Sequence, residues 1–410
     1  MEEHKCRFCG EGLKHTFVDL GMSPLSNSYL TADKLLKMEP FFPLTSYVCS
    51  KCFLVQLPAF NTSEEIFSDY AYFSSYSDSW LAHCKEYTNN VIDRFNLDSQ
   101  SQIIEIASND GYLLQYFKQA GLPVLGIEPA ENVAKVAIEA GIDSVVEFFG
   151  KNLATKLKAR NIEADLLIGN NVLAHVPDLN DFVAGLKILL GANGVISMEF
   201  PHLLELIDNN QFDTIYHEHF SYYSFLTVKE VFLAHGLKLF DVEQIKTHGG
   251  SLRIYGCHLE DDRYDITERA QKLLAVETER GLALVETYIK FSNQVKKTKQ
   301  AILKFMIEIA EEGKTIVGYG APAKGNTLLN FCGIRTDMLP YTVDRSPHKQ
   351  KLFLPGTHIP IFAPEKILED KPEFVLILPW NIKDEIMDQM DQIRSWGGRF
   401  VTFIPRVQVH

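Results

Sequence analysis

Two pairs of closely spaced cysteines near the start of the chain constrain its fold more than any other feature. Cys6 and Cys9 form one C-x-x-C pair, and Cys49 and Cys52 form a second. Four thiolates at this spacing suit one tetrahedral zinc ion. Because four protein ligands leave no open coordination position, we expect a structural zinc that clamps an ordered N-terminal lobe. Scattered core cysteines are the alternative interpretation.

Length, composition and net charge limit the number of domains and the kinds of partner that we expect. The 410 residues suffice for two or three domains of roughly 100–200 residues each. The hydrophobic content of 46% is ordinary for a globular protein, and no segment resembles a membrane span, so we expect no membrane partner. A net charge of −13 argues against nucleic acid as a partner, because binding phosphates requires a basic face.

The remaining cysteines indicate a compartment. Cys84, Cys257 and Cys332 are isolated, which favours a reducing cytoplasm over a disulfide framework. The first six residues contain no apolar signal core, so we expect a cytoplasmic protein. The sequence leaves the oligomeric state open, and a monomer is the state we expect.

Alternating strands and helices follow an aromatic stretch at 60–80. That stretch includes Tyr70 and reads either as a packed contact between domains or as a lid whose tyrosines reach a polar ligand. The alternation after it predicts a parallel, doubly wound sheet with a ligand beyond the carboxyl ends of its strands. The expected strands are 102–107, 124–128, 165–169 and 195–200, with helices at 112–120 and 132–140.

An acidic residue closes the second of these strands. Glu128 lies 17 positions after Gly111, about where a Rossmann-like fold places the carboxylate that binds ribose hydroxyls. The turn at 108–111 has one glycine in place of G-x-G-x-x-G, so a pyrophosphate cradle is poorly supported. A nucleoside ligand without a pyrophosphate fits better, and S-adenosylmethionine is such a ligand.

At this point the sequence resembles the class I methyltransferases, and within them the zinc-containing C-methyltransferases that act on nucleotide-linked ketosugars. The resemblance covers nearly the whole chain, with its motifs in the same order. One departure is Ala107, where that family often has glycine, which affects how closely the backbone approaches the cofactor. The matching motifs are the paired cysteines, L-V-Q at 54–56, S-N-D-G at 108–111, Y-H-E-H-F-S-Y at 216–222 and G-Y-G-A-P-A-K-G at 318–325.

The resemblance implies an α/β fold with an N-terminal zinc-binding lobe, a central class I methyltransferase (Rossmann-like) domain and a C-terminal second Rossmann-like domain. The expected boundaries are 1–68, 69–258, bridging helices at 259–312, and 313–410. It also implies roles for individual residues. The catalytic set is His219, Tyr216 and Glu218; the cofactor set is Glu105, Asp110, Gly111, Glu128 and Asn170; the substrate set is Tyr70, Asn171, His175 and Lys324.

The chemistry of the Y-H-E-H segment agrees with that assignment. Methylating carbon requires removal of a C–H proton, which is feasible beside a carbonyl, and histidine is suited to take it at neutral pH. His217 and His219 share a face on an extended strand but diverge in a turn. Taken alone, the segment also fits a metal pair or a satisfied core network. Negative charge developing on the keto oxygen needs a donor, for which His175, Asn171 and a tyrosine are candidates.

Three further segments carry open alternatives. Glu199 is either a substrate ligand or a structural group, and the T-H-G-G turn at 247–250 either lies near the site or is a hairpin turn. A helical region at 262–312 leads to a second α/β unit that opens at 315–320. There Lys324 and the glycine turn either hold a nucleotide diphosphate or form a tight turn.

These features together predict an S-adenosylmethionine-dependent C-methyltransferase with a structural zinc. The expected substrate is a TDP- or GDP-linked 4-keto-deoxysugar, methylated at C-3. The alternatives are a sugar O- or N-methyltransferase, a nicotinamide-dependent nucleotide-sugar oxidoreductase or epimerase, and a zinc-stapled binding module with a degenerate enzyme domain.

Overall fold

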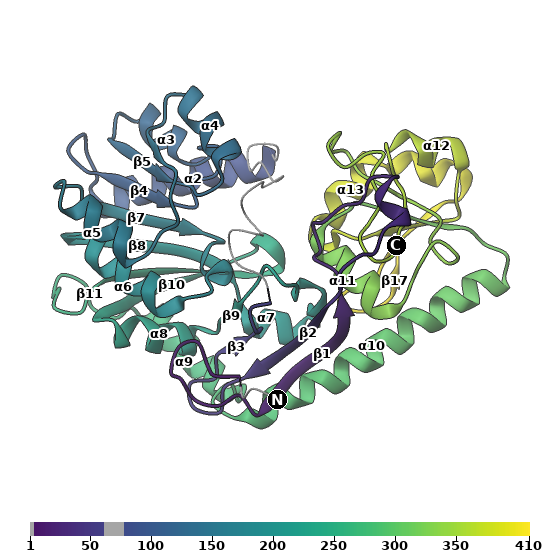
Figure 1. Cartoon of the computed structure of the whole chain (residues 1–410), viewed down its shortest axis with the longest axis horizontal. Coiled ribbons are helices and arrows are strands. Elements are labelled where there is room, and N and C mark those ends of the chain that lie inside the picture. Colours follow the sequence, from purple (N-terminus) through teal and green to yellow (C-terminus); the bar gives the residue numbers. More distant parts are fainter. Residues whose placement is uncertain (1–3, 61–77) are drawn as a thin grey trace.

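A computed structural model describes residues 4–60 and 78–410. Three β-sheets organise the chain, with a seven-stranded sheet on the left of Figure 1 and a six-stranded sheet on the right. The long helix α10 (Val285–Glu311) runs toward the six-stranded sheet along the lower side of the molecule (Figure 1). The predicted α/β class is confirmed. In the part of the chain that the structure describes, no helix is long and apolar enough to cross a membrane.

The seven-stranded sheet contains the predicted parallel strands. Its order is β10-β11-β8-β7-β4-β5-β6, in which β8, β7, β4, β5 and β6 run parallel and β10 and β11 form an antiparallel hairpin beside β8. A tight turn joins these two strands, and only an antiparallel pair permits so short a connection. The strands are β4 (Ile103–Ile106), β5 (Val124–Ile127), β6 (Ser144–Val145), β7 (Ala164–Asn170), β8 (Leu190–Pro201), β10 (Leu237–Ile245) and β11 (Ser251–His258).

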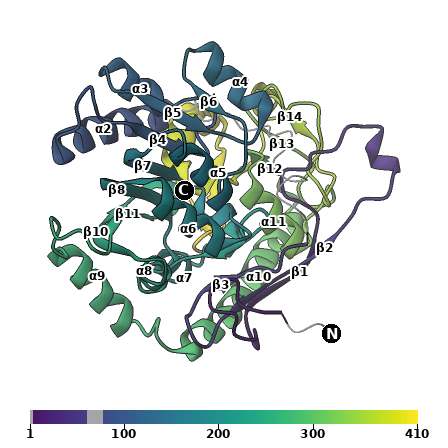
Figure 2. The ribbon, with the colours of Figure 1, turned by 60° about the vertical axis from the view of Figure 1, so that its left-hand side comes forward.

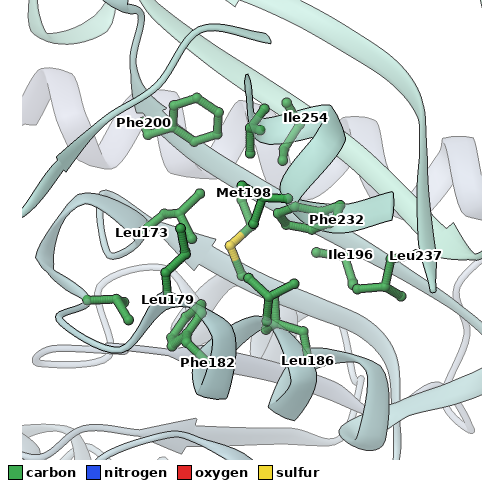
Figure 3. Close-up of a cluster of buried hydrophobic side chains, with 14 of the residues drawn as sticks. Leu173, Leu179, Phe182, Leu186, Ile196, Met198, Phe200, Phe232, Leu237 and Ile254 are labelled. Carbon is green, nitrogen blue, oxygen red and sulfur yellow. The ribbon is translucent and has the colours of Figure 1, made fainter. Parts of the chain in front are cut away.

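Helices cover both faces of this sheet and bury its apolar residues. In Figure 3, Leu186 of α6 and Phe232 of α8 pack against Met198 of β8. These side chains are fully buried, and burial of each contributes about 1.5–3 kcal/mol to stability. The helices are α2 (Asp78–Phe95), α3 (Leu114–Gln119), α4 (Glu131–Glu139), α5 (Lys151–Lys158), α6 (Leu179–Leu189) and α8 (Phe225–Ala234). Helix α7 (Leu203–Asp208) follows β8 and packs in the core shared with the N-terminal sheet and α10.

The six-stranded sheet repeats the strand, glycine turn and helix arrangement. Its order is β14-β13-β12-β15-β16-β17, parallel except for the antiparallel edge strand β17. The expected strand at 315–320 is β12, and a glycine turn leads from it to α11. The elements are β12 (Ile316–Tyr319), α11 (Ala323–Cys332), β13 (Thr342–Val343), β14 (Ile361–Phe362), α12 (Glu365–Asp370), β15 (Phe374–Ile377), α13 (Lys383–Gln389), β16 (Arg399–Thr402) and β17 (Gln408–Val409).

The smallest sheet joins the N-terminal lobe to the middle of the chain. β1 (His15–Ser23), β2 (Phe42–Val48) and β3 (Val55–Gln56) are followed in this sheet by β9 (Ser221–Tyr222), which pairs with β3. Helix α9 (Glu268–Glu279) precedes α10, and α10 lies against β1 (Figure 2), where Phe17 stacks on Phe291 with ring centroids 4.7 Å apart. The end of the Y-H-E-H-F-S-Y segment is therefore part of the N-terminal sheet.

Candidate functional site

The four predicted zinc ligands converge in the N-terminal lobe. Their Sγ atoms lie within 4.8 Å of one another, and the Cys6–Cys52 and Cys9–Cys49 Sγ pairs are 3.5 Å apart. Tetrahedral zinc with bonds of about 2.3 Å separates its sulfurs by about 3.8 Å, so the cluster fits the ion. Gln56 Nε2 donates to Cys6 Sγ at 3.2 Å. Four thiolates complete the coordination, which makes this a structural site.

The turn after β4 has an unusual backbone. Ala107, Asn109 and Gly111 all have left-handed conformations, with φ of 56°, 50° and 80°. Ala107 therefore adopts the conformation that a glycine would adopt at the same position. A side chain at Gly111 would place its Cβ 2.4 Å from Ile142 Cδ1, so this glycine is required by packing as well as by φ.

Glu128 holds this turn from the end of β5. Its Oε2 accepts the backbone N–H of Asn109 at 3.0 Å, and its Oε1 accepts that of Ala130 at 2.9 Å. Burial raises the pKa of Glu128, and the two backbone donors act in the opposite direction. Each carboxylate oxygen keeps a second lone pair, which is the capacity that two ribose hydroxyls require.

Other polar groups predicted to bind the cofactor lie buried on the same strands. Among the described residues, Asn170 Oδ1 at the end of β7 has no hydrogen-bond partner. The Glu105 carboxylate on β4 is buried beside Tyr112, and burial raises its pKa well above the usual range. Asp110 is buried in the turn itself. A buried polar atom without a partner is costly, so Asn170 fits a site completed by a polar ligand.

The Y-H-E-H segment forms a turn, closed by a hydrogen bond from His219 N–H to the Tyr216 carbonyl at 2.9 Å. The two histidines diverge as expected of a turn. His217 Nε2 donates to the Pro43 carbonyl at 3.2 Å and faces the N-terminal lobe. His219 points away from that lobe and contacts His175. We call the region around His219, His175 and Lys324, between the seven-stranded and six-stranded sheets, the seam.

His219 is positioned through both ring nitrogens. Nδ1 donates to the Thr214 carbonyl at 3.1 Å, and Nε2 therefore accepts the hydroxyl of Tyr216 at 2.9 Å. Burial, reinforced by the neighbouring His175, lowers the pKa of His219 well below its ordinary value. The ring is neutral at physiological pH, with its basic lone pair on Nε2.

His175 reaches His219 from the short 3₁₀ turn η3 (Leu173–His175) after β7. The two ring centroids are 4.7 Å apart in an edge-on arrangement. Nδ1 of His175 donates to the Glu218 carbonyl at 2.9 Å, and burial lowers the pKa of His175 to about 4. The Glu218 carboxylate accepts from Asn27 Nδ2 at 2.7 Å, and burial raises its pKa to about 7. Three predicted site residues thus lie together.

Lys324 approaches the same seam from the other sheet. Its Nζ donates to Asn381 Oδ1 at 2.7 Å and lies 4.7 Å from the centre of the Trp380 ring. Burial lowers the pKa of Lys324, which the carboxylate of Asp213 opposes. Asp213 in turn accepts the Trp380 indole N–H at 2.7 Å. The sequence assigned no role to Asp213 or Trp380, and neither belongs to a motif that could have revealed it.

Asn171 connects the end of β7 to the hairpin between β10 and β11. Its Nδ2 lies 3.1 Å from Nε2 of His248, in the turn η5 (Thr247–Gly249). The sequence left open whether this turn lies near the site or is only a hairpin turn, and it assigned His248 no role. Glu199 proves to be structural, because Arg253 Nε donates to it at 2.7 Å and His83 Nε2 lies 3.3 Å from it. Tyr70 lies outside the described residues.

Comparisons with known proteins agree with this arrangement. Three family models match successive parts of the chain, namely "Putative zinc binding domain" over 6–67, "Methyltransferase domain" over 81–242 and "C-methyltransferase C-terminal domain" over 246–405. The C-methyltransferase NovU of Streptomyces niveus is 34% identical over 405 residues, which are 99% of this chain and 96% of NovU.

Solved structures share the fold at much lower identity. The magnesium protoporphyrin IX methyltransferase ChlM of Synechocystis PCC 6803 is 14% identical with a TM-score of 0.35, over 47% of this chain and 90% of ChlM. The PH0226 protein of Pyrococcus horikoshii OT3 is 15% identical with a TM-score of 0.37, over 49% of this chain and 100% of that protein. Scores this low carry no argument about mechanism.

The full-length match and the three consecutive family models select one of the alternatives left open by the sequence. They favour methyl transfer to carbon over transfer to oxygen or nitrogen, over nicotinamide chemistry, and over a binding module without activity. The chain belongs to the family of zinc-binding, S-adenosylmethionine-dependent C-methyltransferases.

Proposed function

We propose that this enzyme methylates the carbon beside the keto group of a nucleotide-linked 4-keto-deoxysugar, at C-3. The Tyr216–His219 pair carries the proposal. It places a neutral imidazole, oriented by Thr214 and with its Nε2 lone pair toward Tyr216, in a buried seam between two α/β sheets. A base of this kind is what carbon methylation beside a ketone requires.

In the proposed reaction His219 Nε2 takes the proton from the substrate carbon. The C–H electron pair moves into the bond toward the carbonyl carbon, and the carbonyl π electrons move onto oxygen to give an enolate. The enolate carbon then forms the new C–C bond, and the imidazolium of His219 returns its proton to solvent. Tyr216 donates to Nε2 in the resting state and must release it before the proton is taken. S-adenosylmethionine, when bound, would supply the methyl group: its S–CH₃ bond breaks as the C–C bond forms, and the electron pair stays on sulfur to give S-adenosylhomocysteine.

The cofactor would lie along the carboxyl ends of β4, β5 and β7. Glu128 would accept the ribose hydroxyls, while the turn at Asp110 and Gly111 would bring backbone N–H groups close to the ligand. Glu105 and Asn170 would contribute buried carboxylate and amide oxygens. These oxygens suit a ligand that carries hydroxyl and ammonium donors and a positive sulfonium.

The sugar nucleotide would lie on the opposite side of the seam. Glu218, held by Asn27, would accept sugar hydroxyls, and His175 would contact the sugar beside the base. Lys324 near the start of α11 would offer positive charge and a helix N-terminus to a diphosphate of TDP or GDP. The enzyme would act as a monomer in the cytoplasm.

Proton exchange tests this function without relying on the full reaction. A TDP- or GDP-linked 4-keto-6-deoxyhexose is incubated with the enzyme in D₂O, and loss of the C-3 proton signal is followed by NMR. We expect exchange that depends on His219 and, on adding S-adenosylmethionine, a new methyl group on C-3. Calorimetry with S-adenosylhomocysteine, TDP and GDP identifies the preferred carrier. No exchange with either sugar nucleotide would overturn the proposal.

A further inference from the structure

His248 is the one histidine of the seam that comes from the β10–β11 hairpin. Its turn η5 follows β10 of the seven-stranded sheet. The turn also packs against Trp380, which follows β15 of the six-stranded sheet, because a side chain at Gly249 would place its Cβ 2.5 Å from the Trp380 ring. His248 and Lys324 also lie near enough to His219 to act on its pKa, after burial and His175. Trp80 lies beside His248, with ring centroids 5.5 Å apart, and its ring is also 6.0 Å from that of Tyr112, which follows the proposed cofactor turn at 108–111. His248 thus sits between the cofactor side and the catalytic base.

The hydrogen bonds fix which ring nitrogens can donate. Nδ1 of His219 and Nδ1 of His175 each donate to a backbone carbonyl, so both neutral rings present the acceptor Nε2. His248 has the opposite arrangement. Asn171 Nδ2 donates to its Nε2, which places the proton of the neutral ring on Nδ1. Burial lowers the pKa of His248 to about 4, so the ring stays neutral near pH 7.

The Nδ1–H group of His248 has no hydrogen-bond partner among residues 4–60 and 78–410. The side chain is half-buried, in contrast to the fully buried core around it. This N–H group lies near two histidines, His175 and His219, whose Nε2 atoms are acceptors. It is therefore suited to donate a hydrogen bond to an oxygen of a ligand. An enolate oxygen is the strongest acceptor that the proposed reaction creates.

Backbone strain marks the same pair. Asn171 and His248 both have φ of 55°, a left-handed conformation that asparagine adopts readily and that is uncommon for other residues with a side chain. The conformation is held in place, because Gln211 Nε2 donates to the Gly249 carbonyl at 2.7 Å and Ser251 Oγ to the Thr247 carbonyl at 2.9 Å. Strain that neighbouring contacts enforce is typical of functional sites.

We infer that His248 is a further catalytic residue, whose Nδ1–H donates a hydrogen bond to the keto oxygen as negative charge develops there. Asn171 is a positioning residue that fixes the tautomer. The inference rests on the proposed function, since it requires a ketone in the substrate. Electrons move from the C–H bond taken by His219 to the carbonyl oxygen, and His248 keeps its proton throughout. A donor that acts only on the developing charge lowers the barrier without tightening ground-state binding.

Three substitutions at one position test this role. His248→Asn keeps an N–H donor at the place of Nδ1, His248→Asp puts an acceptor there, and His248→Gly removes the side chain. All three residues tolerate the left-handed backbone. The measurement is C-3 proton exchange of a TDP-linked 4-keto-6-deoxyhexose in D₂O without S-adenosylmethionine, alongside methyl transfer and S-adenosylhomocysteine binding.

We expect His248→Gly and His248→Asp to lose about 10²–10³-fold in both exchange and methyl transfer, and His248→Asn to lose about tenfold or less. S-adenosylhomocysteine affinity and thermal midpoint should stay near those of the wild type. Equal losses in His248→Asn and His248→Gly would overturn the donor role, as would normal exchange in His248→Asp. A wild-type enzyme that exchanges no proton would instead overturn the proposed function, and this inference with it.

Discussion

The seven-stranded and six-stranded sheets hold the turn after their first strand in the same way. In the former, Glu128 at the end of β5 accepts backbone N–H groups from Asn109 and Ala130. In the latter, Asp344 after β13 accepts those of Ala321 and Ser346, both at 2.8 Å. Each acid binds the turn that follows the neighbouring strand and the residue two positions after itself.

The sheets differ in the charge that surrounds this shared geometry. Around Glu128 lie Glu105 and Asp110, and in addition to burial the charges of Asp110 and Glu128 both act to raise the pKa of Glu105. Beside Asp344 lies Lys349 Nζ at 3.8 Å, and Lys324 follows in the first turn of α11. The turn of the seven-stranded sheet has acidic neighbours and would suit a sulfonium nucleoside. The turn of the six-stranded sheet has cationic neighbours and would suit a diphosphate. Under the proposed function, charge rather than backbone geometry would separate the ligand preferences of the two sheets.

The largest expected effect comes from replacing the proposed base in the seam, which should change methyl transfer without changing ligand binding on either sheet. His219→Asn should reduce methyl transfer by about 10²–10⁴-fold, because the general base is lost. S-adenosylhomocysteine affinity, measured by calorimetry, should not change. His217→Asn is the matched control, since His217 bonds to Pro43 in the N-terminal lobe, and it should keep most activity. Near-normal turnover in His219→Asn would show that the base is another residue.

A second test concerns the charge buried between the sheets. Burial raises the folded pKa of Glu218 to about 7 from 4.5, so the folded protein holds a proton that the unfolded chain releases. The contribution of Glu218 to stability should therefore fall as pH rises from about 4.5 to 7, by about 3 kcal/mol. Glu218→Gln should remove this contribution, so that the difference in stability between variant and wild type shifts in favour of the variant between pH 4 and pH 8. Denaturant unfolding at both pH values measures this, with exposed Glu139→Gln as the control.

Paired substitutions examine the two acids directly. Glu128→Gln should weaken S-adenosylhomocysteine binding by about 1.5–3 kcal/mol, the range for hydrogen bonds to a charged group, and leave TDP or GDP binding unchanged. Asp344→Asn should do the reverse. If both variants weakened only S-adenosylhomocysteine binding, the six-stranded sheet would be a scaffold without a ligand.

The smallest expected effect lies in the backbone directly after the first strand of each sheet. Ala107 and Gly320 occupy equivalent places with φ of 56° and 90°. Ala107→Gly should stabilise the protein by about 1 kcal/mol, because it removes the cost of a left-handed alanine. Gly320→Ala should destabilise it by more, since its Cβ would lie 2.5 Å from Pro379 Cδ. Thermal midpoints of the two variants and the wild type compare them.

Local patterns in the sequence were enough to predict the strands, the cysteine cluster and the acid at Glu128. Each depends on residues that are close along the chain or on a repeated strand-to-helix alternation. The antiparallel pairing of β10 and β11 with β8 and the addition of β9 to the N-terminal sheet were not predicted, because pairing partners are far apart in sequence. Two-residue strands such as β9 also carry too little pattern to detect.

The contacts of the seam were harder to predict for the same reason. His248 meets Asn171, and Trp380 meets Asp213, across 77 and 167 positions of the chain. No spacing rule links such residues. The divergence of His217 and His219 was open in the sequence, because it depends on whether that segment is extended or turned, and tertiary contacts with Pro43 and Thr214 decide it.

Gln56 connects the zinc-binding lobe to the segment that carries the proposed base. Its side chain donates to the Cys6 thiolate, and its backbone on β3 pairs with Ser221, two residues after His219. One residue thus bridges the metal cluster and the strand that follows the base. We therefore expect the lobe and the segment that carries the proposed base to depend on each other. A chimera that exchanges residues 6–60 must also carry a matching 216–222 segment, or it will bind zinc and lose the alignment of its base.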